Sequence, residues 1–191
     1  PNVNSLENDP RDIMYLPWRV DPEGSVKLAL NLFPKTKRVF IITGAEDGIL
    51  PFIDEAKREL LPWEKKLDIE YSNSMSYEEM IQRTSSLSNE SVVLYSTFFT
   101  DRLNRSFIPA EVVTDVCKAS KVPVFATLEY YLELGIVGGA LLETERLGRQ
   151  AGNIAIEYLS GNLVLKEHVT IFDAHIRTML NWNELNHFEY S

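Results

Sequence analysis

The chain has 191 residues, of which 45% are hydrophobic and 25% are charged, a composition typical of a globular protein of one domain or slightly more. This composition excludes a disordered tail, a collagen and a small disulfide-rich fold. The 19 Lys and Arg residues stand against 28 Asp and Glu residues, so the net charge is −9 and the chain lacks the positive field that attracts nucleic acid. We therefore expect no nucleic-acid partner.

The pattern along the chain predicts strands that alternate strictly with helices after an extended entry segment. Short apolar runs predict strands at 38–43, 67–71, 91–95, 122–126 and 135–141. Amphipathic spacing predicts helices at 24–33, 49–60, 77–84, 109–117 and 144–160. Ser76 and Glu79 form a capping box at the start of the third helix. A last strand is expected at 169–172, followed by a closing segment at 176–185.

This alternation predicts the fold class. Strands and helices joined by short loops form a parallel sheet that is covered by helices on both faces, with right-handed crossovers. We therefore expect an α/β protein, a three-layer sandwich built on a parallel sheet.

In such a sheet, ligands bind at the carboxyl ends of the strands, where helix N-termini and free amides converge. The loops at these ends are 43–47, 72–76, 96–101 and 127–131. They carry hydroxyls, aromatics and acids, a mixture that suits a small polar or aromatic molecule. A single Ser, Thr or Asp in such a loop more often caps or turns the chain. The segment STFFTD is a stronger signal, because Phe98 and Phe99 cannot both point into the core.

Motifs for nucleotide binding and for hydrolysis are missing. The segment TGAEDG after the first strand lacks the glycine spacing of a dinucleotide loop, and no phosphate-binding Gly-Lys-Ser/Thr motif occurs. No serine lies in a nucleophile-elbow pattern. The histidines lie in the C-terminal quarter without metal-ligand spacing, at His168, His175 and His187. We therefore expect a binding protein rather than an enzyme, with no metal and no cofactor.

Three stretches resemble the type 1 periplasmic-binding-protein fold, at 29–44, 91–162 and 179–188. More narrowly, the chain resembles a version of this fold that is related to ABC-transporter substrate-binding proteins and serves as the extracytoplasmic sensor of bacterial two-component histidine kinases. The similarity covers roughly residues 20–188, and its most specific pieces are LYSTFFTD, PVFATLEYYLELGIVGG and a Trp-x-x-Leu near the end. Asn104 and Arg105 stand where the family often has a glycine, so we expect this loop to have its own shape.

The resemblance implies one lobe of a two-lobed protein, with flavodoxin-like or Rossmann-like topology. It divides the chain into an entry or hinge segment (1–20), an α/β ligand-binding lobe (21–141), and a return helix and C-terminal segment (142–191). The last part would pack on an N-terminal lobe that the sequence lacks, so we expect a fragment. Leu147, Ile154 and Tyr158 of helix 144–160 would then lack their usual cover. We expect this helix to form a homodimer or to dock elsewhere.

The resemblance also implies a function. It indicates a small-molecule-binding sensor domain of a two-component histidine kinase, in the extracytoplasmic (periplasmic) part of a membrane-anchored bacterial protein, whose lobes close over the ligand. The alternatives are the solute-binding subunit of an ABC uptake transporter and an enzyme with a flavodoxin-like sheet. The residues expected to contact the ligand are Thr43, Glu46, Ser96, Phe98, Asp101 and Tyr130. Phe98 and Tyr130 would stack on it, and Asp101 would accept a hydrogen bond or pair with an amine.

Overall fold

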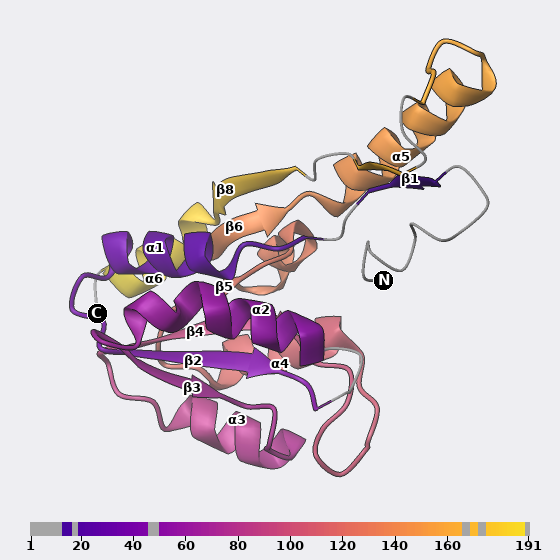
Figure 1. The fold of residues 1–191 in the computed structure, drawn as a ribbon. Helices are drawn as coiled ribbons and strands as arrows, with labels where there is room; N and C mark the ends of the chain where they lie inside the picture. Colours follow the sequence, from indigo (N-terminus) through magenta and orange to yellow (C-terminus); the bar gives the residue numbers. More distant parts are fainter. Residues whose placement is uncertain (1–12, 17–18, 46–49, 166–168, 172–174, 190–191) are drawn as a thin grey trace.

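The computed structural model describes residues 13–16, 19–45, 50–165, 169–171 and 175–189, and a six-stranded sheet lies at the centre of this part of the chain (Figure 1). The strand order is β3-β2-β4-β5-β6-β8. The strands are β2 (Arg38–Thr43), β3 (Asp68–Tyr71), β4 (Ser91–Thr97), β5 (Val124–Ala126), β6 (Gly138–Leu142) and β8 (Ile176–Leu180). Neighbouring strands pair in parallel from β3 to β6, whereas β8 pairs antiparallel with β6. The predicted α/β sandwich is confirmed, with an antiparallel edge strand that the sequence did not predict.

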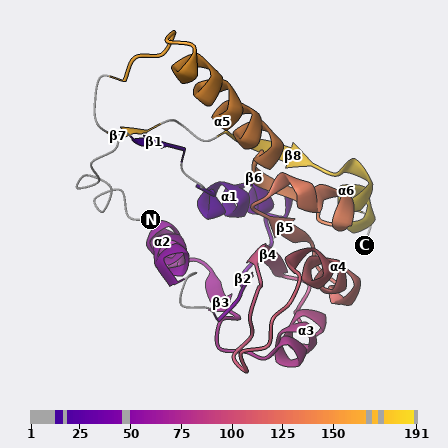
Figure 2. The ribbon, with the colours of Figure 1, turned by 90° about the vertical axis from the view of Figure 1, so that its right-hand side faces the viewer.

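Helices cover both faces of this sheet. Figure 2 shows α3 and α4 on one face and α1 and α2 on the other. The helices are α1 (Pro22–Leu32), α2 (Leu50–Leu60), α3 (Tyr77–Ser85), α4 (Pro109–Ala119), α5 (Thr144–Leu159) and α6 (Trp182–Glu189). Short 3-10 helices occupy Leu61–Trp63 (η3) and Glu129–Leu134 (η4). None of the helices in the described ranges is both long enough and apolar enough to cross a membrane.

Local sequence signals fix where two of these helices begin. The Oδ1 atom of Asp21 accepts a hydrogen bond from Gly24 N at 2.6 Å, and Pro22 occupies the first turn of α1. Ser76 N donates to Glu79 Oε2 at 2.7 Å, and Glu79 N donates to Ser76 Oγ at 3.3 Å. The predicted capping box is therefore present, and it places the N-terminus of α3 directly after the loop that follows β3.

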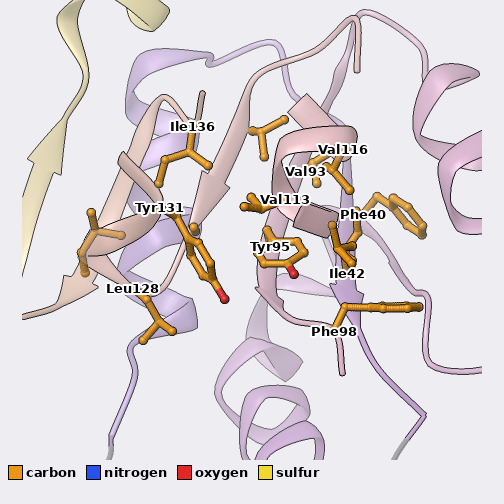
Figure 3. Packing of buried hydrophobic residues seen from close by; sticks show 14 of the residues in the cluster. Phe40, Ile42, Val93, Tyr95, Phe98, Val113, Val116, Leu128, Tyr131 and Ile136 are labelled. Carbon is orange, nitrogen blue, oxygen red and sulfur yellow. The ribbon is translucent and has the colours of Figure 1, made fainter. Parts of the chain in front are cut away.

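The hydrophobic core has one cluster on each face of the sheet. The cluster beneath α3 and α4 is shown in Figure 3, and its largest fully buried side chains are Tyr95, Tyr131, Phe40 and Phe98. The rings of Tyr95 and Tyr131 meet edge to face with their centroids 5.1 Å apart. The Tyr95 hydroxyl donates to Pro109 O at 2.8 Å, which ties β4 to the start of α4. The other cluster joins the sheet to α1, α2 and α6.

The last predicted elements differ in detail from the structure. The strand expected at 169–172 is β7 (Val169–Ile171), which pairs in parallel with β1 (Ile13–Tyr15) outside the main sheet. The strand expected at 135–141 begins at Gly138, because η4 and a left-handed Gly135 with φ 103° precede it. The closing segment at 176–185 divides into β8 and α6.

Helix α5 projects away from the main sheet (Figures 1 and 2). Leu147 is buried against the core, so the expectation that it lacks cover is wrong. Ile154 is half-buried, whereas Tyr158 is exposed and Leu159 is 83% exposed near the free end of the helix. The homodimer and the N-terminal lobe remain predictions.

Candidate functional site

The carboxyl ends of β2, β4 and β5 lie side by side, because these strands are neighbours in the sheet. We call this region the carboxyl edge and define it as residues 43–45, 97–100 and 127–131. Thr43 at the end of β2 pairs in register with Thr97 at the end of β4. The fold therefore brings together three of the four loops that the sequence singled out, and the fourth, 72–76, follows β3 beside β2.

Threonine hydroxyls at this edge have unused hydrogen-bonding capacity. Thr43 Oγ1 and Thr97 Oγ1 are both buried, and neither has a hydrogen-bond partner among the described residues. The backbone of Thr43 is satisfied separately: its N donates to Ser72 Oγ at 2.9 Å, and the Ser72 hydroxyl donates to Thr43 O at 2.9 Å. A buried hydroxyl without a partner destabilises a fold by about 1–3 kcal/mol. Such groups therefore call for a functional explanation.

The two phenylalanines after β4 point in different directions. Phe98 is fully buried and packs edge to face against Phe107 and Tyr77, with ring centroids 5.6 Å and 6.4 Å away. Phe99 is 44% exposed. The expectation that only one ring of the pair enters the core is confirmed. A stacking role for Phe98 remains a prediction, but of these two phenylalanines it is Phe99 that exposes its ring at the carboxyl edge.

Tyr130 and Tyr131 lie in the first turn of η4, the 3-10 helix that follows β5. Tyr130 is 44% exposed, and its ring lies against that of Tyr131 with the centroids 4.1 Å apart. Tyr131 is fully buried, and Figure 3 shows its hydroxyl directed toward the end of the sheet where Phe98 and Leu128 lie. Burial raises the pKa of Tyr131. This hydroxyl is therefore neutral and can donate a hydrogen bond.

Asp101 is held by protein groups. Its carboxylate is fully buried and accepts hydrogen bonds from Leu103 N at 2.9 Å, Arg105 N at 3.1 Å and Tyr77 N at 3.2 Å. The Nε atom of Arg105 donates to Asp101 Oδ2 at 2.9 Å. Burial alone would raise the pKa of Asp101, but these hydrogen bonds outweigh it and lower the pKa to about 2. Direct ligand contact by Asp101 remains a prediction, and in this structure its oxygens bind Arg105 and backbone amides.

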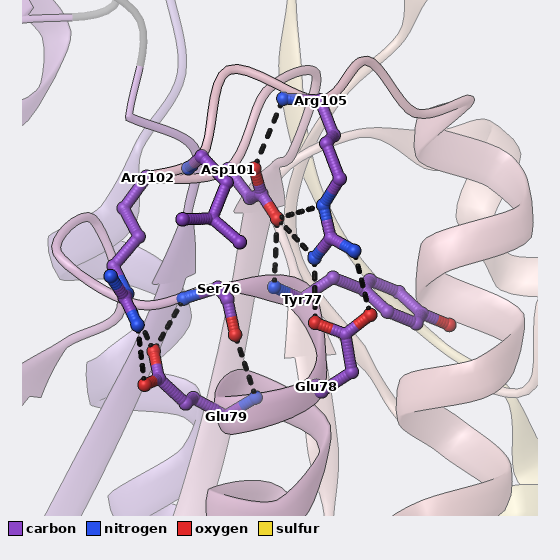
Figure 4. Close-up of polar contacts among 8 residues, drawn as sticks. Ser76, Tyr77, Glu78, Glu79, Asp101, Arg102 and Arg105 are labelled. Carbon is purple, nitrogen blue, oxygen red and sulfur yellow. Dashed lines mark hydrogen bonds and ion pairs between the residues drawn. The ribbon is translucent and has the colours of Figure 1, made fainter.

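Two arginines join the loop after β4 to the first turn of α3, as Figure 4 shows. Arg105 donates from Nη1 and Nη2 to the Glu78 carboxylate at 2.9 Å and 2.6 Å. Arg102 donates from Nε and Nη2 to the Glu79 carboxylate, both at 2.8 Å. Hydrogen bonds from these arginines lower the pKa values of Glu78 and Glu79 to about 2. Both pairs are bidentate, the geometry in which arginine holds a carboxylate most firmly.

The departure at Asn104 and Arg105 has a structural consequence. Asn104 has φ 57°, a left-handed conformation that glycine adopts readily and asparagine tolerates better than most residues. The chain turns at Asn104, whose N donates to Asp101 O at 2.9 Å, and Arg105 then points back to the Asp101 carboxylate. The loop therefore makes the turn that a glycine would allow and adds an ion pair.

The structure places the remaining predicted residues as follows. Ser96 is buried in β4, next to Thr97. Glu46 lies outside the described residues. The six predicted ligand contacts did not include Thr97 and Phe99, which the sequence placed only in the loop after the third strand, or Arg105. The Asp-x-x-x-Arg spacing could have indicated the pair of Asp101 with Arg105. The second partner of Arg105 is Glu78, 27 positions away, and no local pattern links these two residues. Among the described residues, no group of three or more His, Cys, Asp and Glu is arranged to hold a metal ion.

Solved structures of similar architecture agree with this topology. The chain superposes on a domain described as an ABC domain in complex with L-Trp from Streptococcus pneumonia, with a TM-score of 0.62, 16% identity, and coverage of 92% of this chain and 56% of that one. It superposes equally well, at a TM-score of 0.62 and 20% identity, on a ligand-free, open substrate-binding protein with adhesive properties from Clostridium difficile, covering 86% of this chain and 54% of that one. The chain has a periplasmic-binding-protein-like fold.

A comparison of sequences also finds a similar binding protein. The chain is 28% identical over 171 residues to a tyrosine-binding protein of Clostridioides difficile (strain R20291). The aligned region covers 90% of this chain and 48% of that protein. No protein-family model matches the chain. By these coverages, the chain spans about half the length of the proteins that it matches. Two of these proteins are named as binding proteins, the tyrosine-binding protein and the substrate-binding protein.

Proposed function

We propose that this chain forms one wall of the ligand site of a solute-binding protein that serves an ABC uptake transporter, and that the solute is an aromatic amino acid. The observation that carries the proposal is the pair of buried, unpartnered hydroxyls of Thr43 and Thr97 at adjacent strand ends. A bound solute that hydrogen-bonds to them would offset the cost of burying them. An uptake receptor works outside the cytoplasm, so an extracytoplasmic location is part of the proposal.

The chemistry of the carboxyl edge suits an aromatic amino acid. Phe99 and Tyr130 expose rings there, and an aromatic side chain stacks on such rings. Neutral hydroxyls at Thr43, Thr97 and Tyr131 match the polar substituents of the same solute. The names of the relatives add support, since one is a tyrosine-binding protein and another was crystallised with L-Trp.

These relatives favour the transport function over the histidine-kinase sensor, which the resemblance of the sequence had favoured. The two functions differ in what the full gene encodes. A downstream membrane-spanning helix and kinase domains would indicate a sensor, and a stop codon soon after Ser191 would indicate a transport receptor. Both require the same small-molecule binding at the carboxyl edge, so the binding experiments below apply to either.

Replacing Thr43 with valine is expected to change stability and binding in opposite directions. Valine has nearly the same shape but no hydroxyl, so Thr43→Val should raise the free energy of unfolding by about 1 kcal/mol. The same change should raise the Kd for L-tyrosine about tenfold, because the ligand loses a hydrogen-bond partner. Titration calorimetry and urea unfolding of the full-length protein measure the two effects.

Thr84→Val is the matched control for this substitution. Thr84 is a buried threonine in α3, but its hydroxyl already donates to Met80 O at 2.9 Å. Its loss should lower stability slightly and leave the Kd unchanged. Unaltered L-tyrosine affinity in Thr43→Val, together with unaltered affinity in Thr97→Val, would contradict the proposed site.

Phe99→Ala is expected to weaken binding with little effect on folding. The ring is partly exposed and lies outside both core clusters, so the free energy of unfolding should change by less than about 0.5 kcal/mol. Loss of stacking should raise the Kd for L-tyrosine and L-tryptophan about fivefold. Leu103→Ala, at an exposed apolar residue of the same loop, should leave the Kd values for L-tyrosine and L-tryptophan unchanged. Equal effects of the two substitutions on binding would rule out stacking on Phe99.

A further inference from the structure

The loop after β4 is closed on itself by backbone hydrogen bonds. Phe107 N donates to Phe99 O at 2.7 Å, Thr100 and Ser106 form an antiparallel bridge, and Asp101 N donates to Arg105 O at 3.1 Å. The loop therefore has a short two-stranded stem with a turn at its tip. Phe99 lies at the base of this stem, two residues after Thr97 and hence at the carboxyl edge.

The tip of the loop is anchored to α3 by charged groups on both sides. Asp101 accepts a hydrogen bond from Tyr77 N in the first turn of α3, and Arg105 bridges Asp101 and Glu78. Arg102 holds Glu79, and its backbone N donates to Met75 O at 3.1 Å. We call Glu78, Glu79, Asp101, Arg102 and Arg105 the Asp101 clamp (Figure 4). It fixes the loop after β4 to the loop and helix that follow β3.

The same loop also holds the segment after β2. Ala45 N donates to Thr100 O at 2.8 Å, and Gly44 N donates to Thr97 O at 3.1 Å. The two segments approach so closely that a Cβ on Gly44 would lie 2.9 Å from Thr100 O. Movement of the loop after β4 would therefore also move the backbone that follows Thr43.

We propose that Asp101 and Arg105 are positioning residues, which hold Phe99, Thr97 and the segment after Thr43 in the arrangement that receives the ligand. The proposal rests on the binding function proposed above and assigns Asp101 a different role from direct ligand contact. Both oxygens of its carboxylate already accept hydrogen bonds from the loop and from α3. If the ordered loop becomes a minority conformation, the apparent Kd rises in inverse proportion to its population.

Asp101→Asn and Arg105→Gln in the full-length protein test this proposal. We expect each to raise the Kd for L-tyrosine about fivefold, which corresponds to the ordered loop in about one molecule in five. Hydrogen exchange at the amides of Ala45 and Phe107 should become about tenfold faster. Arg105 is partly exposed, so Arg105→Gln folds even if Asp101→Asn is strongly destabilised.

Arg83→Gln is the matched control. Arg83 makes a bidentate pair with Glu70 from the last turn of α3, at 2.6–3.1 Å, away from the clamp. It should lower the melting temperature and leave both the Kd and the exchange at Ala45 and Phe107 unchanged. If the clamp variants bind L-tyrosine as tightly as the wild type, the positioning role is overturned while the proposed function stands. If the wild type binds neither L-tyrosine nor L-tryptophan, both are overturned.

Discussion

Replacing Gly138 with alanine is expected to lower the free energy of unfolding by about 3 kcal/mol or more. Gly138 has φ 151°, a conformation that residues with a side chain rarely adopt. A Cβ at this position would lie 2.2 Å from Met179 O and 3.0 Å from Leu180 Cα, both in the backbone of β8. The β6–β8 ladder would have to move apart to admit the methyl group, and the strain of the conformation adds to this cost. Urea unfolding followed by circular dichroism measures the loss.

Gly152→Ala is the control for this substitution. Gly152 lies inside α5, and apart from its chain neighbours and the backbone of its own helix a Cβ there would have no heavy atom within 4 Å. Alanine favours the helix over glycine by about 1 kcal/mol, so the free energy of unfolding should stay the same or rise by up to that amount. Similar losses in the two variants would contradict the explanation by close approach of β8.

The glycines of β6 illustrate where sequence reasoning succeeds and where it stops. A short apolar run predicted the strand, and its glycines suggested an interruption. The structural reason for Gly138 is β8, a strand from much further along the chain whose backbone lies against it, whereas Gly139 lies against Ala126 O in β5. The alternation of strands and helices is local information, because each apolar run has its own length and period. The partner and direction of an edge strand depend on tertiary contacts, which the pattern within β8 does not encode.

The candidate site shows the same division. The carboxyl edge was predictable, since parallel strands of one sheet bring their ends together. The choice between neighbouring side chains was not, because Phe98 and Phe99 differ only in which of them the stem of the loop turns inward. Asp101, an acid in a strand-end loop, was a reasonable candidate for ligand contact. In the structure its carboxylate binds a backbone amide of α3 and Arg105, which also binds Glu78. Such a network becomes visible only once α3 is placed beside the loop.

Acid is expected to unfold the protein in part through Asp101. Its folded-state pKa is lowered to about 2, whereas an aspartate in an unfolded chain titrates near about 3.9. As the pH falls, the unfolded chain therefore takes up a proton at this position before the folded protein does. The stabilising contribution of Asp101 is complete above about pH 5 and is lost as the pH falls toward 2. Glu78 and Glu79, with pKa values also lowered to about 2, act in the same direction.

Asp101→Asn separates this contribution from the rest of the acid response. At pH 7 the variant should lose about 3 kcal/mol of unfolding free energy, because asparagine leaves Arg105 without its buried anion and turns one acceptor into a donor. The difference in the free energy of unfolding between the wild type and the variant should decrease as urea unfolding is repeated from pH 5 down to pH 2.5. Asp68→Asn, at an exposed carboxylate paired with Arg38, should stay within about 0.5 kcal/mol of the wild type throughout. A gap for Asp101→Asn that stays constant with pH would mean that the buried carboxylate is not the source of the acid sensitivity.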